Sequence, residues 1–132
     1  MEAFYTNVIG LTKMSGGHEQ GIVFFCLNES PGGHRAVLAL FRNDVNMRDG
    51  LHPTTDSAPV TGGQSSLHHL ALSLPWEEQD AVMAWYDSLG QTYRVEHFDW
   101  IGWRGIFTED PEGNTVELVA KDPRHAGPPT KW

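Results

Sequence analysis

The sequence predicts an α+β fold built from two related, β-rich modules. Short apolar or alternating runs separated by glycine and proline are typical of strands. The second half of the chain follows the order strand, helix and three strands. The two halves also match at a constant offset of 80 positions, which relates four residue pairs: Gly10 and Gly90, Glu29 and Glu109, Pro31 and Pro111, and Gly33 and Gly113. Such an offset across a helix end, a turn and a strand indicates a duplicated unit.

The first half is predicted to be an incomplete module, residues 1–43. Gly10 suits the left-handed position that ends a helix. The counterpart of residue 69 would fall before Met1, so we expect this module to lack its opening strand. Its predicted elements are one helix end and two strands: Ala3–Leu11, Ile22–Leu27 and Arg35–Phe41.

The second half is predicted to be a complete module, residues 67–121. A segment rich in Gly, Pro, Ser and Thr, residues 44–66, is expected to link the modules, and residues 122–132 are expected to form an extended tail. The predicted elements are a strand, a helix and three further strands, at 67–74, 75–89, 93–98, 105–108 and 115–120. The helix has one apolar stripe, predicted to face the sheet: Val82, Trp85, Tyr86 and Leu89.

Composition excludes several classes of partner. Only 9 Lys and Arg stand against 17 Asp and Glu, which gives a formal net charge of −8. We therefore expect binding neither to nucleic acid nor to a membrane, because both surfaces are anionic. No apolar run approaches the roughly 20 residues of a membrane-spanning helix. The single cysteine, Cys26, lies in an apolar strand, where a buried inert thiol is expected, and the default location is the cytoplasm.

A family resemblance follows from three motifs of the second half. They are His69-Leu70-Ala71-Leu72, a helix ending in Leu89-Gly90, and the run from Asp110-Pro111-Glu112-Gly113-Asn114 to Glu117-Leu118. Together they resemble the second βαβββ module of the vicinal oxygen chelate superfamily, which includes glyoxalases, bleomycin-resistance proteins and extradiol dioxygenases. The resemblance implies paired modules whose mixed sheet curls into a trough with the helices outside.

The same resemblance points to a metal site at His69 and Glu117. His69 would face the trough, and so would Glu117, whose carboxylate among apolar neighbours needs a partner or a metal. Imidazole and carboxylate donors suit a divalent cation. A His–Glu hydrogen bond that lines a metal-free pocket is the alternative, and His68 could replace His69 through a bulge.

The resemblance also bears on the reaction. Metal-dependent relatives complete the ligand set with a His on the opening strand that is missing here, and Val37 stands at the counterpart of Glu117. This favours an extradiol-like set over a four-ligand glyoxalase set, with Fe²⁺ as the expected metal, Mn²⁺, Zn²⁺ or Ni²⁺ as alternatives, and no metal if the site is degenerate. Phe107, which stands where ring-cleaving relatives usually carry Tyr, is a candidate residue of the substrate pocket, and His97 is the candidate catalytic His near the metal.

Further candidates for the substrate pocket are aromatic or charged. Trp100 and Trp103 could line a pocket or belong to the core, Arg104 could clamp a carboxylate or pair with an acid, and His34 lies at a turn. The leading function is a small-molecule metalloenzyme of the extradiol-dioxygenase type, acting on a substrate that chelates the metal through two oxygens. The alternatives are a glyoxalase-type lyase or isomerase, a metal-free binding protein like those of bleomycin resistance, and an inactive relative. An exposed sheet edge predicts a homodimer.

Overall fold

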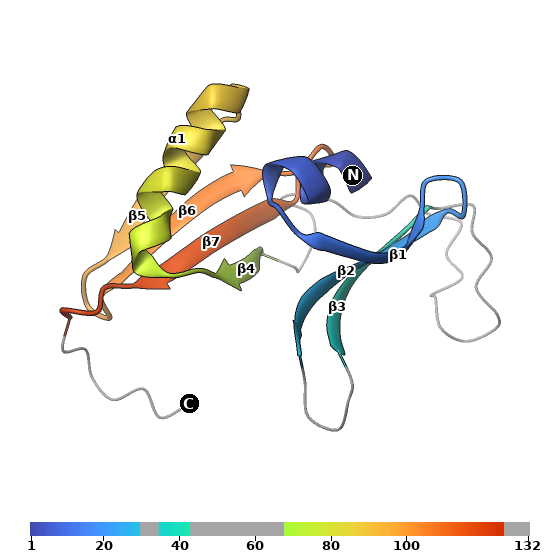
Figure 1. The fold of residues 1–132 in the computed structure, drawn as a ribbon. Helices are drawn as coiled ribbons and strands as arrows, with labels where there is room; N and C mark the ends of the chain where they lie inside the picture. Colours follow the sequence, from blue (N-terminus) through green and yellow to red (C-terminus); the bar gives the residue numbers. More distant parts are fainter. Residues whose placement is uncertain (30–34, 43–67, 126–132) are drawn as a thin grey trace. The chain divides into compact units, whose positions relative to one another are not determined.

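The computed structural model describes residues 1–29, 35–42 and 68–125. The chain divides into two compact units, Met1–Pro59 and Val60–Trp132, so the division falls inside the predicted linker. Each unit contains one β-sheet, with helices in addition (Figure 1). The predicted α+β fold class is confirmed. Within the described residues, no helix has both the length and the apolar character needed to cross a membrane.

The first unit carries a three-stranded antiparallel sheet in the order β1-β2-β3. Its core lies between the sheet and a single helical turn, where the fully buried Phe25 packs 5.9 Å from the ring of Tyr5. The polar, glycine-rich strand β1 has no apolar alternation and is absent from the sequence prediction. The elements are η1 (Phe4–Val8), β1 (Thr12–Gly17), β2 (Ile22–Glu29) and β3 (Arg35–Phe41).

Two irregularities interrupt the strand pairing of this sheet. In β2, Cys26 pairs with Val37 but Asn28 pairs with Ala36, so Leu27 is one extra residue. The pairing of β1 with β2 skips Met14 in the same way. A bulge of this kind reverses the face on which the following side chains lie. Phe25 therefore faces η1, whereas Cys26 and Val37 lie on the opposite face.

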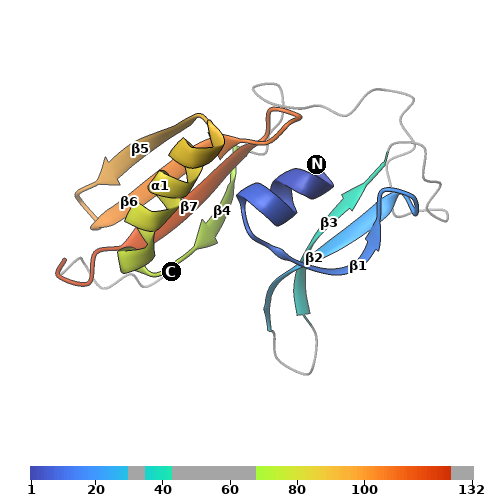
Figure 2. The same cartoon turned by 45° about the horizontal axis from the view of Figure 1, so that its top comes forward.

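The second unit carries a four-stranded mixed sheet in the order β4-β7-β6-β5. β4 runs parallel to β7, and the other neighbours are antiparallel (Figure 2). This sheet is open and uncurled, unlike the predicted trough, and its pairs contain no bulge that would bend it. The elements are β4 (Leu70–Ser73), η4 (Trp76–Glu78), α1 (Gln79–Leu89), β5 (Tyr93–Phe98), β6 (Trp103–Glu109) and β7 (Thr115–Lys121).

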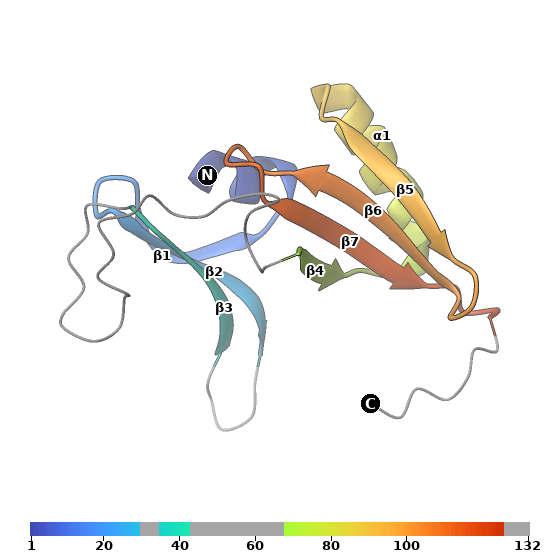
Figure 3. The same ribbon diagram turned by 180° about the vertical axis from the view of Figure 1, so that it is seen from behind.

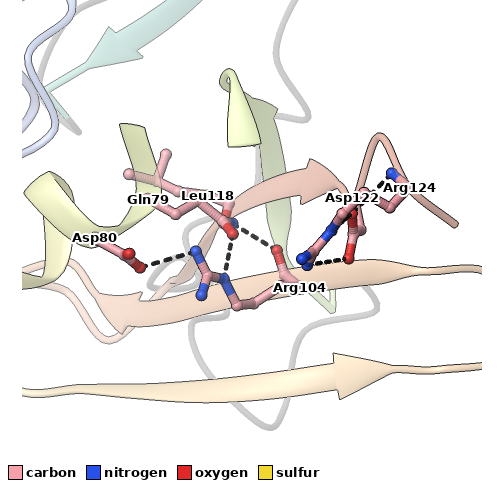
Figure 4. A network of polar contacts seen from close by, with 6 residues as sticks. All are labelled: Gln79, Asp80, Arg104, Leu118, Asp122 and Arg124. Carbon is pink, nitrogen blue, oxygen red and sulfur yellow. Dashed lines mark hydrogen bonds and ion pairs between the residues drawn. The ribbon is translucent and has the colours of Figure 1, made fainter. Parts of the chain in front are cut away.

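Helix α1 covers one face of this sheet through a polar anchor. The buried Gln79 donates from Nε2 to the carbonyl oxygens of Arg104 (2.6 Å) and Leu118 (3.3 Å), and it accepts from Arg104 Nε (2.5 Å) (Figure 4). Arg104 also donates to Asp80 Oδ1 (3.0 Å). About two helical turns further along, the fully buried Tyr86 packs 5.7 Å from the ring of Tyr93.

The predicted apolar stripe of the helix is wrong at two of its four positions. Trp85 and Leu89 are 48% and 44% exposed, while Gln79 is fully buried. The buried Gln79 amide is hydrogen-bonded to strand carbonyl oxygens on the side of the helix that faces the sheet, as a buried polar group requires. The inward stripe is therefore one of spacing i, i+3, i+4 and i+7 that begins with a polar residue: Gln79, Val82, Met83 and Tyr86.

The duplication is visible in the strand bounds. Shifted by 80 positions, β3 gives the bounds of β7, and β2 and β1 fall within one residue of β6 and β5. Gly10 and Gly90 both adopt left-handed backbone, with φ of 83° and 65°. In the second unit the turn before β7 is held by Asp110, whose Oδ1 accepts from the backbone N–H groups of Glu112 and Asn114, both at 2.9 Å. This turn fixes where β7 begins.

Candidate metal site

The strand register brings His69 and Glu117 to the same face of the second sheet. Glu117 lies in β7 opposite Ala71 of β4, and His69 comes two residues before Ala71. Residues two apart on a strand share a face. Arg104, which contacts α1, pairs with Ala120, so Glu117 lies on the face away from the helix. Figure 3 shows the sheet from that side.

The two side chains converge at hydrogen-bond distance. His69 Nε2 lies 3.0 Å from Glu117 Oε2, and their side chains are 31% and 7% exposed. Two ligands of one cation, each at about 2.1 Å from it, also lie roughly 3 Å apart at a right angle. The distance therefore suits both a direct His–Glu contact and two adjacent ligands of a divalent cation.

The surroundings of Glu117 set its ionisation. Burial raises the pKa of the Glu117 carboxyl, while the neighbouring His69 and, more weakly, Arg94 act to lower it. Burial is the largest of these effects, so the pKa lies above the ordinary value. A carboxylate at this position is stabilised by any further positive charge that binds beside it, which is the electrostatic requirement for a cation site.

Space for the Glu117 carboxylate comes from a glycine on the neighbouring strand. A Cβ at Gly105 of β6 would lie 2.3 Å from Glu117 Oε1 and 2.7 Å from Phe107 Cε2. Both side chains therefore lean over the Gly105 backbone. The ring of Phe107 also meets the His69 ring edge to face, at 5.8 Å between centroids. Phe107 thus forms an apolar wall beside the imidazole and the carboxylate.

The other ring nitrogen of His69 also has a partner. His68 Nδ1 and His69 Nδ1 lie 2.7 Å apart, so one of them carries the proton. If His69 Nε2 binds a metal, His69 Nδ1 holds its proton and donates to His68. If a neutral His69 instead donates from Nε2 to Glu117, its Nδ1 accepts from His68. The two uses of the site therefore require opposite tautomers of His69.

The donor set fits a divalent cation in part. One nitrogen and one oxygen donor are correctly spaced, but no cluster of three or more His, Cys, Asp and Glu side chains occurs in residues 1–29, 35–42 and 68–125. Two protein ligands leave the remaining coordination positions to water and to oxygen atoms of a substrate.

The other predicted site residues are dispersed. Phe107 lies beside His69, and Trp103 lies further along β6 on the same face. Trp100 is 70% exposed in the β5–β6 turn. Arg104 and its strand partner His97 belong to the helix-covered face, where Arg104 stacks 4.5 Å over the ring of Trp76. His34 lies outside the described residues.

Arg94 and Gly105 border the site and are absent from the sequence prediction. Strand alternation could have found both, because Arg94 pairs with Phe107, and Gly105 precedes Phe107 by two residues. A pocket at the end of the sheet also reaches this face, and its lining includes Tyr93, Arg94, Phe107 and Thr115. Arg94 and Phe107 thus connect the pocket with the His69–Glu117 pair.

Solved structures place this fold among known proteins. Lactoylglutathione lyase from Agrobacterium tumefaciens superposes with a TM-score of 0.61 at 24% identity, over 89% of this chain and 81% of that protein. A glyoxalase/bleomycin resistance protein/dioxygenase from Nocardioides gives 0.61 at 21% identity, over 99% and 79%. The fosfomycin resistance protein FosX from Listeria monocytogenes gives 0.56 at 18% identity, over 92% and 82%.

The chain has the fold of the vicinal oxygen chelate superfamily. The resemblance predicted from the His69, Gly90 and Asp110–Leu118 motifs is thereby confirmed at the level of the fold. No protein-family model matches the sequence, and no curated protein matches it. The identities to these vicinal oxygen chelate structures are low, so the fold is shared and the chemistry must be argued from the residues of this chain.

Proposed function

We propose that this protein binds a divalent cation through His69 and Glu117 and, on it, a small molecule that offers two oxygen atoms. The observation that carries the proposal is the 3.0 Å approach of His69 Nε2 to Glu117 Oε2 on the face away from α1. The fold supports it, because the superposed structures carry names that include a lyase and a glyoxalase/dioxygenase. An extradiol-dioxygenase-like activity with Fe²⁺ is the specific reaction that we favour; Mn²⁺, Zn²⁺ and Ni²⁺ are the alternative metals.

Each residue has a defined part in this proposal. His69 Nε2 and Glu117 Oε2 hold the cation, and His68 accepts the Nδ1 proton of His69, which fixes the imidazole in the correct tautomer. Phe107 excludes water from one side of the imidazole. A bound divalent cation would supply Lewis-acid polarisation of the two substrate oxygens.

Metal binding by the purified protein tests the proposal. Calorimetric titration of the wild-type chain with Zn²⁺ should give one site, and His69→Ala and Glu117→Gln should each reduce the affinity more than roughly tenfold, as loss of a ligand does. His97→Ala is the matched control, because His97 is exposed on the other face of the sheet. Equal affinity in all four proteins would contradict the ligand assignment.

A metal-free binding protein is the second candidate. It is favoured by the absence of a third donor in the described part of the chain. Nitrogen NMR of the imidazoles separates the two functions, because a neutral His69 that donates to Glu117 carries its proton on Nε2, whereas a metal ligand carries it on Nδ1. The spectrum recorded with and without Zn²⁺ should show the proton on Nδ1 only when the metal is present.

A homodimer is also proposed. β7 has a neighbour on both sides, whereas β3, its counterpart in the first unit, pairs only with β2 among the described strands. An open strand edge of this kind is a ready pairing surface for a second chain. Light scattering should give twice the mass of the 14.7 kDa chain, and a monomeric mass at micromolar concentration would exclude the dimer.

A further inference from the structure

We propose that Arg94 is a specificity-determining residue that binds an anionic group, such as a carboxylate, on the small molecule held at the His69–Glu117 site. The inference rests on the proposed function and extends it by naming the charge of the substrate. Its basis is the position of the Arg94 guanidinium on the same sheet face as the two ligands.

Strand pairing aligns the residues involved in one row across the sheet. Arg94 of β5 pairs with Phe107 of β6, and Phe107 pairs with Glu117 of β7. Paired residues point to the same face, so all three lie on the side away from α1. The row ends at Ala71 of β4, which pairs with Glu117, and His69 precedes Ala71 by two residues. The Arg94 guanidinium and the imidazole therefore flank the Phe107 ring.

The separation suits one small ligand. The guanidinium carbon of Arg94 lies 4.5 Å from the centre of the Phe107 ring, and that centre lies 5.8 Å from the centre of the His69 ring. The guanidinium is consequently no more than about 10 Å from the imidazole, the sum of these two distances. An aromatic ring that carries two adjacent oxygens at one end and a carboxylate at the other can bridge this span while it lies along Phe107.

Arg94 can exchange its present partner for a ligand. Its Nη1 pairs with Glu96 Oε1, and the two side chains are 59% and 48% exposed. An exposed ion pair between residues two apart on one strand is weak, because water screens both charges. A ligand anion seated against Phe107 would be partly shielded from water and could form the two parallel hydrogen bonds that a guanidinium favours.

The charges around the site agree with this role. Glu96 and Glu117 on the same face, and Glu109 and Asp110 in the adjoining pocket, are acidic. An anionic substrate entering this face would be repelled by them unless its charge were received by a basic side chain, and Arg94 is the one that lies beside Phe107.

Two diols that differ in one charge test the inference. With Zn²⁺-loaded wild-type protein, calorimetry should show 3,4-dihydroxybenzoate binding roughly tenfold or more tightly than catechol, the ratio expected of a charge-assisted hydrogen bond. Arg94→Gln should abolish that ratio and leave the Zn²⁺ affinity unchanged. Glu96→Gln should increase the ratio, because the competing carboxylate is removed.

Arg124→Gln is the matched control. Arg124 is also an exposed arginine paired with an acid two residues away, Asp122 at 2.8 Å, but it follows β7 and lies outside the row. This variant should keep the wild-type ratio. Equal affinities of the two diols for wild-type protein, or a ratio that survives in Arg94→Gln, would overturn the inference. Failure of the wild-type chain to bind Zn²⁺ would overturn the proposed metal site and, with it, this role of Arg94.

Discussion

Strands β1-β2-β3 of the first sheet and β5-β6-β7 of the second follow the same antiparallel order, but their corresponding faces carry different side chains. In the second unit the face away from the helix carries Glu117, with Gly105 beside it to make room for the carboxylate. In the first unit Val37 stands at the place of Glu117, and Phe24 pairs with Ala39 where Gly105 pairs with Val119. The shared order of strands preserves the fold in both units. Room for a buried carboxylate depends on two positions, those of Glu117 and Gly105 in the second unit and of Val37 and Phe24 in the first.

The largest expected effect is a loss of stability when the core of the first unit is disrupted. Phe25 is fully buried against Tyr5, so Phe25→Ala should leave a cavity and lower the free energy of unfolding by about 3–5 kcal/mol. Chemical denaturation followed by far-UV circular dichroism measures this loss. A loss below about 1 kcal/mol would show that Phe25 is not a core residue.

A second change fills the space that Gly105 leaves beside Glu117 in the second unit. Gly105→Ala would place a Cβ 2.3 Å from Glu117 Oε1, so the carboxylate must move and the Zn²⁺ affinity should fall roughly tenfold or more. Gly17→Ala in β1 is the control, because its Cβ would meet mainly the flexible end of Gln20, at 3.2 Å. Wild-type affinity in the Gly105 variant would mean that Glu117 does not bind the metal from its observed position.

A third change compares the buried helical tyrosines of the two units, Tyr86 in α1 and Tyr5 in η1. The Tyr86 hydroxyl is buried with no hydrogen-bond partner among the described residues, and burial raises the pKa of Tyr86 to about 12. Tyr86→Phe removes a polar group whose hydration was lost on folding, so the free energy of unfolding should rise by about 1 kcal/mol. Tyr5→Phe in the first unit is the comparison variant, because Tyr5 is buried to a similar extent, at 3% exposed. A lower melting temperature of the Tyr86 variant would show that the hydroxyl is hydrogen-bonded.

The smallest expected effect comes from a carboxylate placed in the first unit. Val37 is 37% exposed, so Val37→Glu should change the free energy of unfolding by less than about 1 kcal/mol. It should create no second Zn²⁺ site, because the three-stranded sheet of the described residues has no strand at the place of β4 and so no counterpart of His69. A titration that reveals two sites in this variant would contradict the requirement for the imidazole.

The sequence predicts most of the fold because the relevant signals are local. The apolar runs of β2, β3 and β7 and the turn at Asp110 depend on residues close together in the chain. The strand β1 could not be found from its composition, since Thr, Lys, Ser and Gly carry no apolar alternation, although the offset of 80 from β5 points to it. The inward position of Gln79 in α1 involves carbonyls 25 and 39 residues away, which no local pattern encodes.

Local sequence patterns also predict only part of the candidate site. Alternation along β4 and β7 suffices to predict that His69 and Glu117 share a face, and the structure places them 3.0 Å apart. Whether they hold a metal stays a proposal. Phe107 and Arg104 are close in sequence but lie on opposite faces of β6. Candidates chosen only by residue type and closeness in sequence therefore come from both sides of the sheet. Assigning faces first separates Arg94 and Gly105, which share the face of Glu117, from Arg104 and His97, which lie on the helix-covered face.

The extra residue Leu27 in β2 also decides which side chain lies beside the counterpart of Glu117. It reverses the faces of the residues that precede it, so Phe25 lies toward η1 and Phe24 lies on the opposite face, paired with Ala39. At the matching place in the second sheet Gly105 pairs with Val119 and leaves room for a carboxylate. A difference of one residue in strand length is thus enough to put a phenylalanine where the other sheet has open space.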